Sequence, residues 1–383
     1  MNARKIPLYK VLTDRHDVEQ VRRVIERGTY WAVGPEIEQF ERAVADYVGR
    51  KHAVAFNSGT SALHAAMLAC GIGHGDEVIT PSFTFIATAN APLFVGAAPI
   101  FADIESETYG LDVQRVSEKI SKDTKAIMPV HYGGLVCRDI RQLKKVAQEH
   151  NVLLIEDAAE ALGSIAYGQK AGSFGDVAVF SFCGNKVITT GEGGIAVTNS
   201  GELFEKLKLV RSHGRLEKEP YFLTTKSLDY VELGFNWRMP TMIAALGISQ
   251  MDKLEKVISM RRKIASQLSA EFRKVDAIQV PEEPQGFRHI YQMYTIQVKD
   301  GTETRQGLQQ HLSKCEIATK IYFEPVHLTS FYRNRLAGKV GSLPETERIS
   351  ASVLTLPIYP MMTSAERRYL ARSVTQYFCD SDS

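Results

Sequence analysis

The chain has 383 residues, of which 44% are hydrophobic, and its 46 basic and 44 acidic side chains leave a net charge of +2. This length is enough for a large α/β domain with a smaller second domain, or for two domains of similar size. Because the charges nearly cancel, no global electric field favours nucleic acid or an anionic membrane as a partner.

The sequence predicts a cytoplasmic protein without a membrane-spanning helix. Residues 1–17 (MNARKIPLYKVLTDRHD) lack the apolar core of a signal peptide. The longest apolar stretch, residues 87–101, is interrupted by asparagine, glycine and proline, which a bilayer-spanning helix hardly tolerates. We therefore expect neither secretion nor membrane insertion.

Residues 35–198 alternate between helix-like and strand-like segments. An amphipathic helix is predicted between Pro35 and Gly49, where apolar residues recur at helical spacing and a glycine ends the pattern. Beyond it, helix-like stretches separate seven short apolar runs: HAVAF, EVIT, APIFAD, KAIMPV, VLLIE, VAVFSF and GIAVT. This alternation indicates an α/β fold, with a mostly parallel sheet covered by helices on both faces.

The sequence pattern changes from about Met251. The segment KLEKVISMRRKIASQLSAEFRKV predicts a charged amphipathic helix, and residues 291–298 (YQMYTIQV) and 318–323 (ATKIYF) are strand candidates. We therefore expect two domains, a large one over residues 1–250 and a smaller C-terminal α+β domain over residues 251–383.

The five cysteines suggest neither a metal site nor a disulfide framework. They are odd in number, far apart in the sequence and without a Cys-x-x-Cys pair. We expect them to be buried thiols, and we predict no metal ion.

The residues that follow the predicted strands are candidates for chemistry, because parallel α/β sheets bind ligands beyond the carboxyl ends of their strands. The segment FNSGTSALHAAMLA combines a strand, a turn of small residues and a helix start. Gly59 would let the backbone approach a ligand closely, Thr60 would offer donors, and the helix N-terminus would attract a phosphate. Simple helix capping explains the same residues equally well.

Two charged residues follow later strands. Asp157 ends the run VLLIED, where a buried carboxylate needs a cation or strong donors to stay ionised, although an ordinary helix N-cap is the simpler interpretation of Asp157 alone. Lys186 follows VAVFSF in a loop of small residues. Desolvation there would lower the pKa of the amine and expose a nucleophile that traps a carbonyl as a Schiff base, whereas a single lysine more often extends to solvent.

Taken together, these features are more specific than any one of them. The lysine lies outside a G-x-x-x-x-G-K-[ST] motif, and GEGGIA lacks the G-x-G-x-x-G spacing, so nucleoside triphosphates and dinucleotides are disfavoured. An aldehyde trap, a carboxylate and a phosphate cradle at one edge of a sheet are what pyridoxal 5′-phosphate requires. We therefore predict this cofactor.

These residues lie in segments that resemble the fold-type I pyridoxal-phosphate enzymes, and specifically the DegT/StrS-type nucleotide-sugar aminotransferases. The resemblance covers nearly the whole chain and rests on segments such as FNSGTSALHAAM, IEDAAEALGS, GSFGDVAVFSF, NKVITTGEGG and YVELGFNWRMP. It implies that the large domain, residues 1–250, binds the cofactor.

The resemblance also implies roles for residues in these motifs. Lys186 is expected to be the Schiff-base lysine and to move a proton as general base and acid. Asp157 is expected to pair with the pyridine nitrogen and keep it protonated. The phosphate-binding positions of the family match Gly59, Thr60 and Ser181.

Phe85 falls where the family places an aromatic ring against the cofactor, with Phe83 as the alternative. Glu160 would lie near the phenolic oxygen of the cofactor, at a position where histidine or glutamine is more frequent. Strand alternation predicts that Ser181, between two core phenylalanines, faces away from them.

Three later residues are expected near the substrate or the neighbouring subunit. Asn236 would reach the cofactor phosphate of a second subunit, which implies a homodimer with shared active sites. Arg238 and His327 are expected to bind substrate. Local turn chemistry, a surface ion pair and a structural histidine are the alternatives for these three residues.

The resemblance implies an aminotransferase that moves an amino group from L-glutamate, by a ping-pong cycle through pyridoxamine phosphate, to a keto sugar on a nucleoside diphosphate. TTGEGG favours a 4-keto-6-deoxy sugar, and FCGNKVITTGEGG is most similar to perosamine-synthase-like members that use a GDP-linked sugar. These motifs do not exclude UDP- and dTDP-linked keto sugars as the acceptor. Transamination of a 3-keto sugar or an inositol-like ketone, and a non-catalytic regulatory protein on the same fold, are the alternatives.

Overall fold

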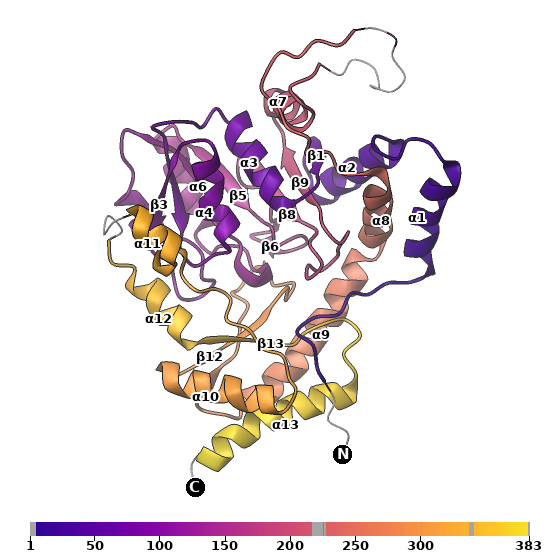
Figure 1. The fold of residues 1–383 in the computed structure, drawn as a ribbon. Helices are drawn as coiled ribbons and strands as arrows, with labels where there is room; N and C mark the ends of the chain where they lie inside the picture. Colours follow the sequence, from indigo (N-terminus) through magenta and orange to yellow (C-terminus); the bar gives the residue numbers. More distant parts are fainter. Residues whose placement is uncertain (1–4, 217–224, 226, 300, 337–340, 382–383) are drawn as a thin grey trace.

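The computed structural model describes residues 5–216, 225, 227–299, 301–336 and 341–381 (Figure 1). Apart from two short strands between residues 165 and 170, the elements up to residue 252 are arranged around a large sheet, and the elements from residue 254 onward form a smaller part beside it. No helix in these described ranges has the length and apolar character needed to cross a membrane.

The larger part is built on a seven-stranded sheet in the order β1-β9-β8-β5-β4-β2-β3. Strand β9 pairs antiparallel with β1 and β8, and the remaining pairs are parallel, so the predicted mostly parallel sheet is confirmed. Each predicted apolar run overlaps one strand. The strands are β1 (His52–Phe56), β2 (Glu77–Pro81), β3 (Ala98–Ala102), β4 (Thr124–Ile127), β5 (Leu153–Asp157), β8 (Val177–Ser181) and β9 (Gly194–Thr198).

Helices cover both faces of this sheet. Along β1, Ala53 and Ala55 belong to one hydrophobic core, and Val54 and Phe56 belong to another on the opposite face, as side-chain alternation along a strand requires. Burial on both faces explains why the strands are continuous apolar runs in the sequence. The helices of this part are α1 (Arg15–Arg27), α2 (Pro35–Val48), α3 (Gly59–Ala69), α4 (Ile86–Phe94), α5 (Val113–Ser117), η1 (Tyr132–Gly134), α6 (Ile140–Glu149), α7 (Gly201–Arg211) and α8 (Thr241–Asp252).

The smaller part is the predicted α+β arrangement. Its sheet has the order β10-β12-β13 with antiparallel pairs, and a second small sheet, β11-β6-β7, joins it to the larger part. The elements concerned are β6 (Ile165–Ala166), β7 (Gln169–Lys170), α9 (Leu254–Phe272), β10 (Ile278–Gln279), β11 (Phe287–Arg288), β12 (Tyr294–Val298), α10 (Gly301–Lys314), η2 (Val326–Leu328), α11 (Ser330–Leu336), α12 (Pro344–Ser352), β13 (Val353–Leu356) and α13 (Ser364–Ser381).

Helix α9 connects the two parts (Figure 1). Leu254 and Ile258, near its start, pack in a core of the large sheet, whereas Leu268 and Phe272, near its end, pack in the core of the smaller part. Ile6 also belongs to the core of the smaller part, although it lies at the other end of the sequence. The division at residues 250 and 251 stays a prediction.

The strand predicted over residues 318–323 is wrong. Only Lys320 pairs there, through an isolated antiparallel bridge to Thr355 of β13. Two residues later the carbonyl of Tyr322 accepts a hydrogen bond from the hydroxyl of Tyr132 in the larger part. At Tyr322 the backbone carbonyl thus bonds to a side chain of the larger part.

The prediction that every cysteine is a buried thiol is also wrong. All five are free thiols, but only Cys137 is buried, whereas Cys379, near the end of α13, is exposed. Cys379 lies on the solvent-facing side of the last helix, so the expectation of burial, which came from residue type alone, fails there.

Candidate active site

A cavity of about 530 Å³ lies at the carboxyl ends of β5 and β8, beside the turn that begins α3. The structure brings together here residues that are far apart in the sequence. Seven of the predicted site residues line this cavity: Gly59, Thr60, Phe85, Asp157, Glu160, Ser181 and Lys186.

Asp157 is fixed at the last position of β5. Its backbone N–H donates to the carbonyl of Pro129 at 2.9 Å, and its carbonyl accepts from the N–H of His131 at 3.0 Å. The residue is 4% exposed, and its carboxylate accepts from the Thr88 hydroxyl at 2.7 Å and the backbone N–H of Ala159 at 3.1 Å. Because a carboxylate has about four acceptor positions, capacity remains for a further donor.

Burial determines the titration of Asp157. Desolvation raises the pKa of this carboxyl above its ordinary value, although Thr88 and Ala159 oppose the effect. A protonated ring nitrogen beside the carboxylate would supply the missing positive charge and donor. The surroundings of Asp157 therefore fit the pyridine nitrogen of pyridoxal phosphate.

Lys186 is held inside the cavity, with its side chain 13% exposed. Its Nζ lies 3.4 Å from Oε1 of Glu160, and the other oxygen of Glu160 accepts the backbone N–H of Gly133 at 2.9 Å. Gly133 thus orients Glu160, and Glu160 orients the amine. This arrangement keeps the amine of Lys186 within the cavity.

The start of α3 forms a cradle for an anion. The N–H groups of the first turn have no backbone partner within the helix, so those of Gly59 and Thr60 can donate to a phosphate. A Cβ at Gly59 would lie 3.0 Å from that of Ser181, so the close approach of these two segments favours glycine. Helix capping, the alternative, is present as well, because the Ser58 hydroxyl accepts a backbone N–H of the same turn at 3.1 Å. The two interpretations are compatible.

Ser181 and Phe85 both line the cavity, and their roles toward the cofactor stay predictions. Ser181 lines the cavity, whereas Phe180 and Phe182 on either side of it are completely buried. Phe85 lines the cavity with 59% of its surface exposed, and Phe83 is completely buried in an aromatic cluster. Of the two phenylalanines, only Phe85 is available to a ligand.

Three predicted residues lie outside this cavity. Asn236 is exposed and pairs through its backbone with Ser212, and Arg238 donates to the Ser212 hydroxyl at 3.2 Å. His327 is buried, with its Nδ1 2.7 Å from the Ser82 hydroxyl and its Nε2 3.4 Å from Glu347. Their roles toward a neighbouring subunit or substrate stay predictions.

Comparison with known proteins decides the family. A family model described as the DegT/DnrJ/EryC1/StrS aminotransferase family matches residues 12–375. The chain belongs to this family. The predicted aminotransferase activity and the predicted pyridoxal phosphate cofactor are confirmed by this membership.

Relatives of this aminotransferase match it over nearly the whole chain. GDP-perosamine synthase of Caulobacter vibrioides is 37% identical over 366 residues, which cover 94% of this chain and 96% of that protein. GDP-perosamine synthase of Vibrio cholerae is 36% identical over 374 residues, covering 97% and 99%. The solved structure of Helicobacter pylori PseC, an aminotransferase involved in the biosynthesis of pseudoaminic acid, has a TM-score of 0.91 at 28% identity, covering 98% of this chain and 100% of that one.

Sequence reasoning missed a hydroxyl chain behind Asp157. Thr88 donates its single proton to Asp157, so the contact of 2.7 Å between Thr84 and Thr88 must have Thr84 as donor. Both threonines are buried. No helical pattern in the sequence signalled this pair, because Thr84 precedes α4 and only Thr88 lies within it.

The smaller part supports the lysine loop of this aminotransferase, which the sequence did not show. Gln292 donates from Nε2 to the carbonyl of Asn185, the residue before Lys186, at 2.8 Å. The buried guanidinium of Arg261 donates to the carbonyls of Tyr291 and Gln292 at 2.9 and 2.8 Å. The loop that carries Lys186 is therefore held by a segment more than a hundred residues away in the sequence.

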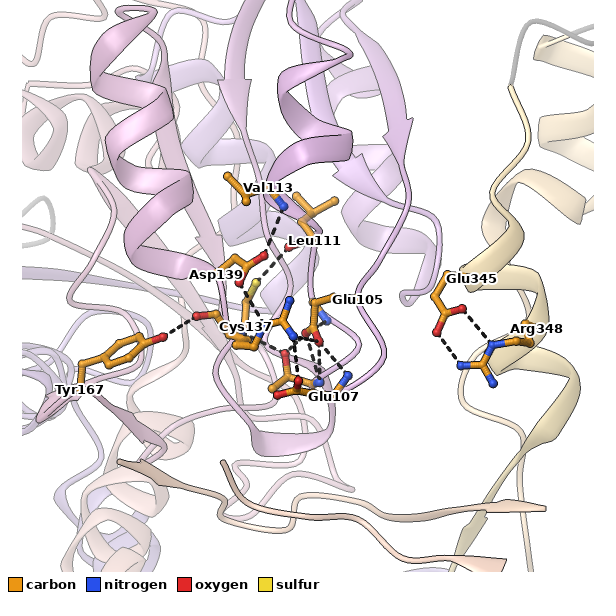
Figure 2. A network of polar contacts seen from close by, with 12 residues as sticks. Glu105, Glu107, Leu111, Val113, Cys137, Asp139, Tyr167, Glu345 and Arg348 are labelled. Atoms are coloured by element: carbon orange, nitrogen blue, oxygen red, sulfur yellow. Dashed lines mark hydrogen bonds and ion pairs between the residues drawn. The ribbon is translucent and has the colours of Figure 1, made fainter. Parts of the chain in front are cut away.

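A polar network holds the segment that follows the Gly133 turn (Figure 2). Glu105 accepts the backbone N–H of Glu107 at 2.7 Å, and Asp139 accepts that of Val113 at 3.4 Å. The Cys137 thiol lies in the same network, and burial raises its pKa well above the ordinary value. Buried polar groups that are satisfied in this way rigidify their surroundings. We therefore expect the network to hold the backbone next to the turn at Gly133, whose N–H orients Glu160.

Proposed function

We propose that the protein transfers the amino group of L-glutamate to a GDP-linked 4-keto-6-deoxy sugar in a ping-pong cycle. The convergence of Lys186, Asp157 and the Gly59 turn on one cavity supports transamination at this site. The relatives named GDP-perosamine synthase support the nucleotide sugar as the acceptor.

The residues of the cavity would divide the chemistry among them. When bound, pyridoxal phosphate supplies an aldehyde that condenses with amines and a ring that withdraws electrons. Asp157 would accept the ring N–H, and the turn at Gly59 and Thr60, together with Ser181, would hold the phosphate. Lys186 would take the proton from the amino-bearing carbon of the substrate. Phe85 would cover one face of the ring.

The assignment of Lys186 can be tested by borohydride reduction. Reduction should attach the cofactor covalently to the wild-type protein and to Lys125→Ala, whose lysine is exposed on β4, and mass spectrometry should locate it at residue 186. Lys186→Ala should bind cofactor without covalent attachment and should lack turnover. Covalent attachment in Lys186→Ala would refute the assignment.

The substrate is tested by mixing the holoenzyme with L-glutamate and a panel of GDP-, UDP- and dTDP-linked keto sugars. Release of 2-oxoglutarate with the GDP-linked 4-keto-6-deoxy sugar is the expected result. Turnover only with a 3-keto sugar or an inositol-like ketone would favour that alternative. No turnover with any ketone, despite covalent cofactor, would favour the regulatory alternative.

The active site would be shared between the subunits of a homodimer, with Asn236 reaching the cofactor phosphate of its neighbour. Exposed apolar side chains just before Asn236, Tyr230, Val231 and Leu233, support a contact surface there. Mixed dimers of Lys186→Ala with Asn236→Ala should regain about a quarter of wild-type activity, because one composite site in each heterodimer is intact. A failure of two inactive variants to complement each other after subunit exchange would refute the shared site.

A further inference from the structure

A ping-pong site must bind two different substrates in one cavity. The donor and acceptor of the proposed function share few features except negative charge, which resides on the carboxylates of L-glutamate and on the diphosphate of the nucleotide sugar. An anion inside a protein needs a cation or several donors to replace its hydration. The site therefore needs a positive group that serves both substrates.

The described wall of the cavity offers few such groups. It contains the carboxylates of Asp157, Glu160 and Glu192, and its basic residues are Lys186 and Lys320. The amine of Lys186 is engaged by Glu160 and is assigned to the cofactor. Lys320 is the remaining cation in the part of this wall that the structure describes.

Lys320 has a fixed backbone, and its exposed side chain lines the cavity. Its N–H donates to the carbonyl of Thr355 at 3.1 Å, and its carbonyl accepts from the N–H of Thr355 at 2.8 Å. Lys320, Tyr322 and Phe323 line the cavity, and Ile321 and Tyr322 also pack against a hydrophobic cluster.

The charge of Lys320 is held in place without being neutralised. Its Nζ lies 4.7 Å from the centroid of the Tyr322 ring, and no carboxylate in the described ranges forms an ion pair with it. A cation–π contact orients an ammonium but leaves its full charge. The smaller part of the fold thus presents a positioned, uncompensated cation to the cavity.

We propose that Lys320 binds the negative group of both substrates in turn, a carboxylate of the amino donor in the first half-reaction and the diphosphate of the acceptor in the second. This inference rests on the proposed function and adds to it the residue that lets one cavity accept both reactants. Tyr322 acts as its positioning residue.

The test compares Lys320→Gln with wild type, with Lys320→Arg and with Lys314→Gln, which removes the same charge from an exposed position at the end of α10. Lys320→Gln should raise the KM for L-glutamate and for the nucleotide sugar by about tenfold each, the value of a charge-assisted hydrogen bond, with little change in kcat. Lys320→Arg should recover most of this loss, and Lys314→Gln should match wild type.

Binding of unreactive anions provides a second measurement. Calorimetric titration of the holoenzyme with glutarate and with GDP should give dissociation constants about tenfold weaker for Lys320→Gln. Added salt should weaken binding to wild type more than to this variant. Tyr322→Leu, which removes the ring under the ammonium, should produce a smaller loss of the same kind.

The outcomes separate this inference from the proposed function. Unchanged KM values and dissociation constants in Lys320→Gln would overturn the inference, and so would an effect confined to one of the two substrates. If wild type turns over none of the sugars, the proposed function fails, while the glutarate and GDP titrations still decide whether Lys320 binds anions.

Discussion

Glu156 and Asp157 are neighbours on β5, and both are buried, with 0% and 4% of their surfaces exposed. Their side chains nevertheless meet very different partners. The carboxylate of Glu156 accepts three backbone N–H groups of residues 172–175 at 2.6 to 2.7 Å and a ring nitrogen of His131 at 2.9 Å, and Arg50 lies 3.6 Å away. Asp157 accepts two hydrogen bonds and faces the cavity.

The pKa values of the two carboxyls shift in opposite directions. Burial alone would raise the pKa of Glu156, but hydrogen bonds from His131 and the backbone lower it below its ordinary value. Burial dominates at Asp157 and raises its pKa. Burial alone therefore does not decide the direction of the pKa shift, which depends on the donors that the protein supplies to each carboxylate.

The largest effect should come from Asp157→Asn. The amide cannot stabilise a protonated ring nitrogen, so kcat should fall by about a thousandfold, as for the loss of a strong electrostatic contact to the reacting system. Absorption spectra should show the cofactor still bound. A kcat near the wild-type value would remove Asp157 from the chemistry and break the contrast with Glu156.

Glu156→Gln should instead affect stability. It leaves Arg50 and the backbone donors without their anion, so the free energy of unfolding should drop by about 3 kcal/mol in urea denaturation. The kcat of the folded enzyme should change little. A large loss of kcat at unchanged stability would mean that Glu156 acts in catalysis.

Thr88→Val should sharpen the contrast by removing one of the two donors of Asp157. We expect kcat to fall about tenfold, because a hydrogen bond to a charged group is worth roughly 1.5 kcal/mol. Thr84→Val, one step further from the carboxylate, is the matched control and should lose less. Equal losses in the two variants would indicate a packing defect rather than a change at Asp157.

The smallest effect concerns the cofactor-free protein. The folded-state pKa of Asp157 is raised, so its ionised form costs stability once the pH exceeds the unfolded value of about 3.9. Asp157→Asn without cofactor should therefore be about 1 kcal/mol more stable than wild type at neutral pH, and the gain should vanish below about pH 4. Thermal unfolding of both proteins across this pH range measures the difference. A gain that persists in acid would show that ionisation of Asp157 is not its cause.

Much of the fold could be predicted from the sequence because its signals are local. The seven apolar runs overlap the strands of the large sheet, and a helix lies where the pattern between Pro35 and Gly49 placed one. The rule that ligands bind at strand ends was enough to select Asp157 and Lys186, which line one cavity.

The remaining features depend on contacts between distant segments. Period and composition gave residues 318–323 the pattern of a strand, but only Lys320 pairs with β13, and the carbonyl of Tyr322 bonds to the distant Tyr132 hydroxyl. The donors of Glu156 come from a loop that returns to β5, so its carboxylate could not be distinguished in advance from that of Asp157. Lys320 and Gln292 reach the cavity and the lysine loop through the packing of the smaller part, which no local pattern encodes.

The hydrogen bond from Gln292 to Asn185 has a consequence for protein engineering. If the C-terminal part were exchanged between family members to transfer substrate specificity, the residues that support the loop carrying Lys186 would be exchanged with it. A chimaera that keeps glutamine at position 292 and arginine at position 261 preserves that support. A chimaera that lacks these two residues would hold Lys186 less firmly, even if every residue that lines the cavity were unchanged.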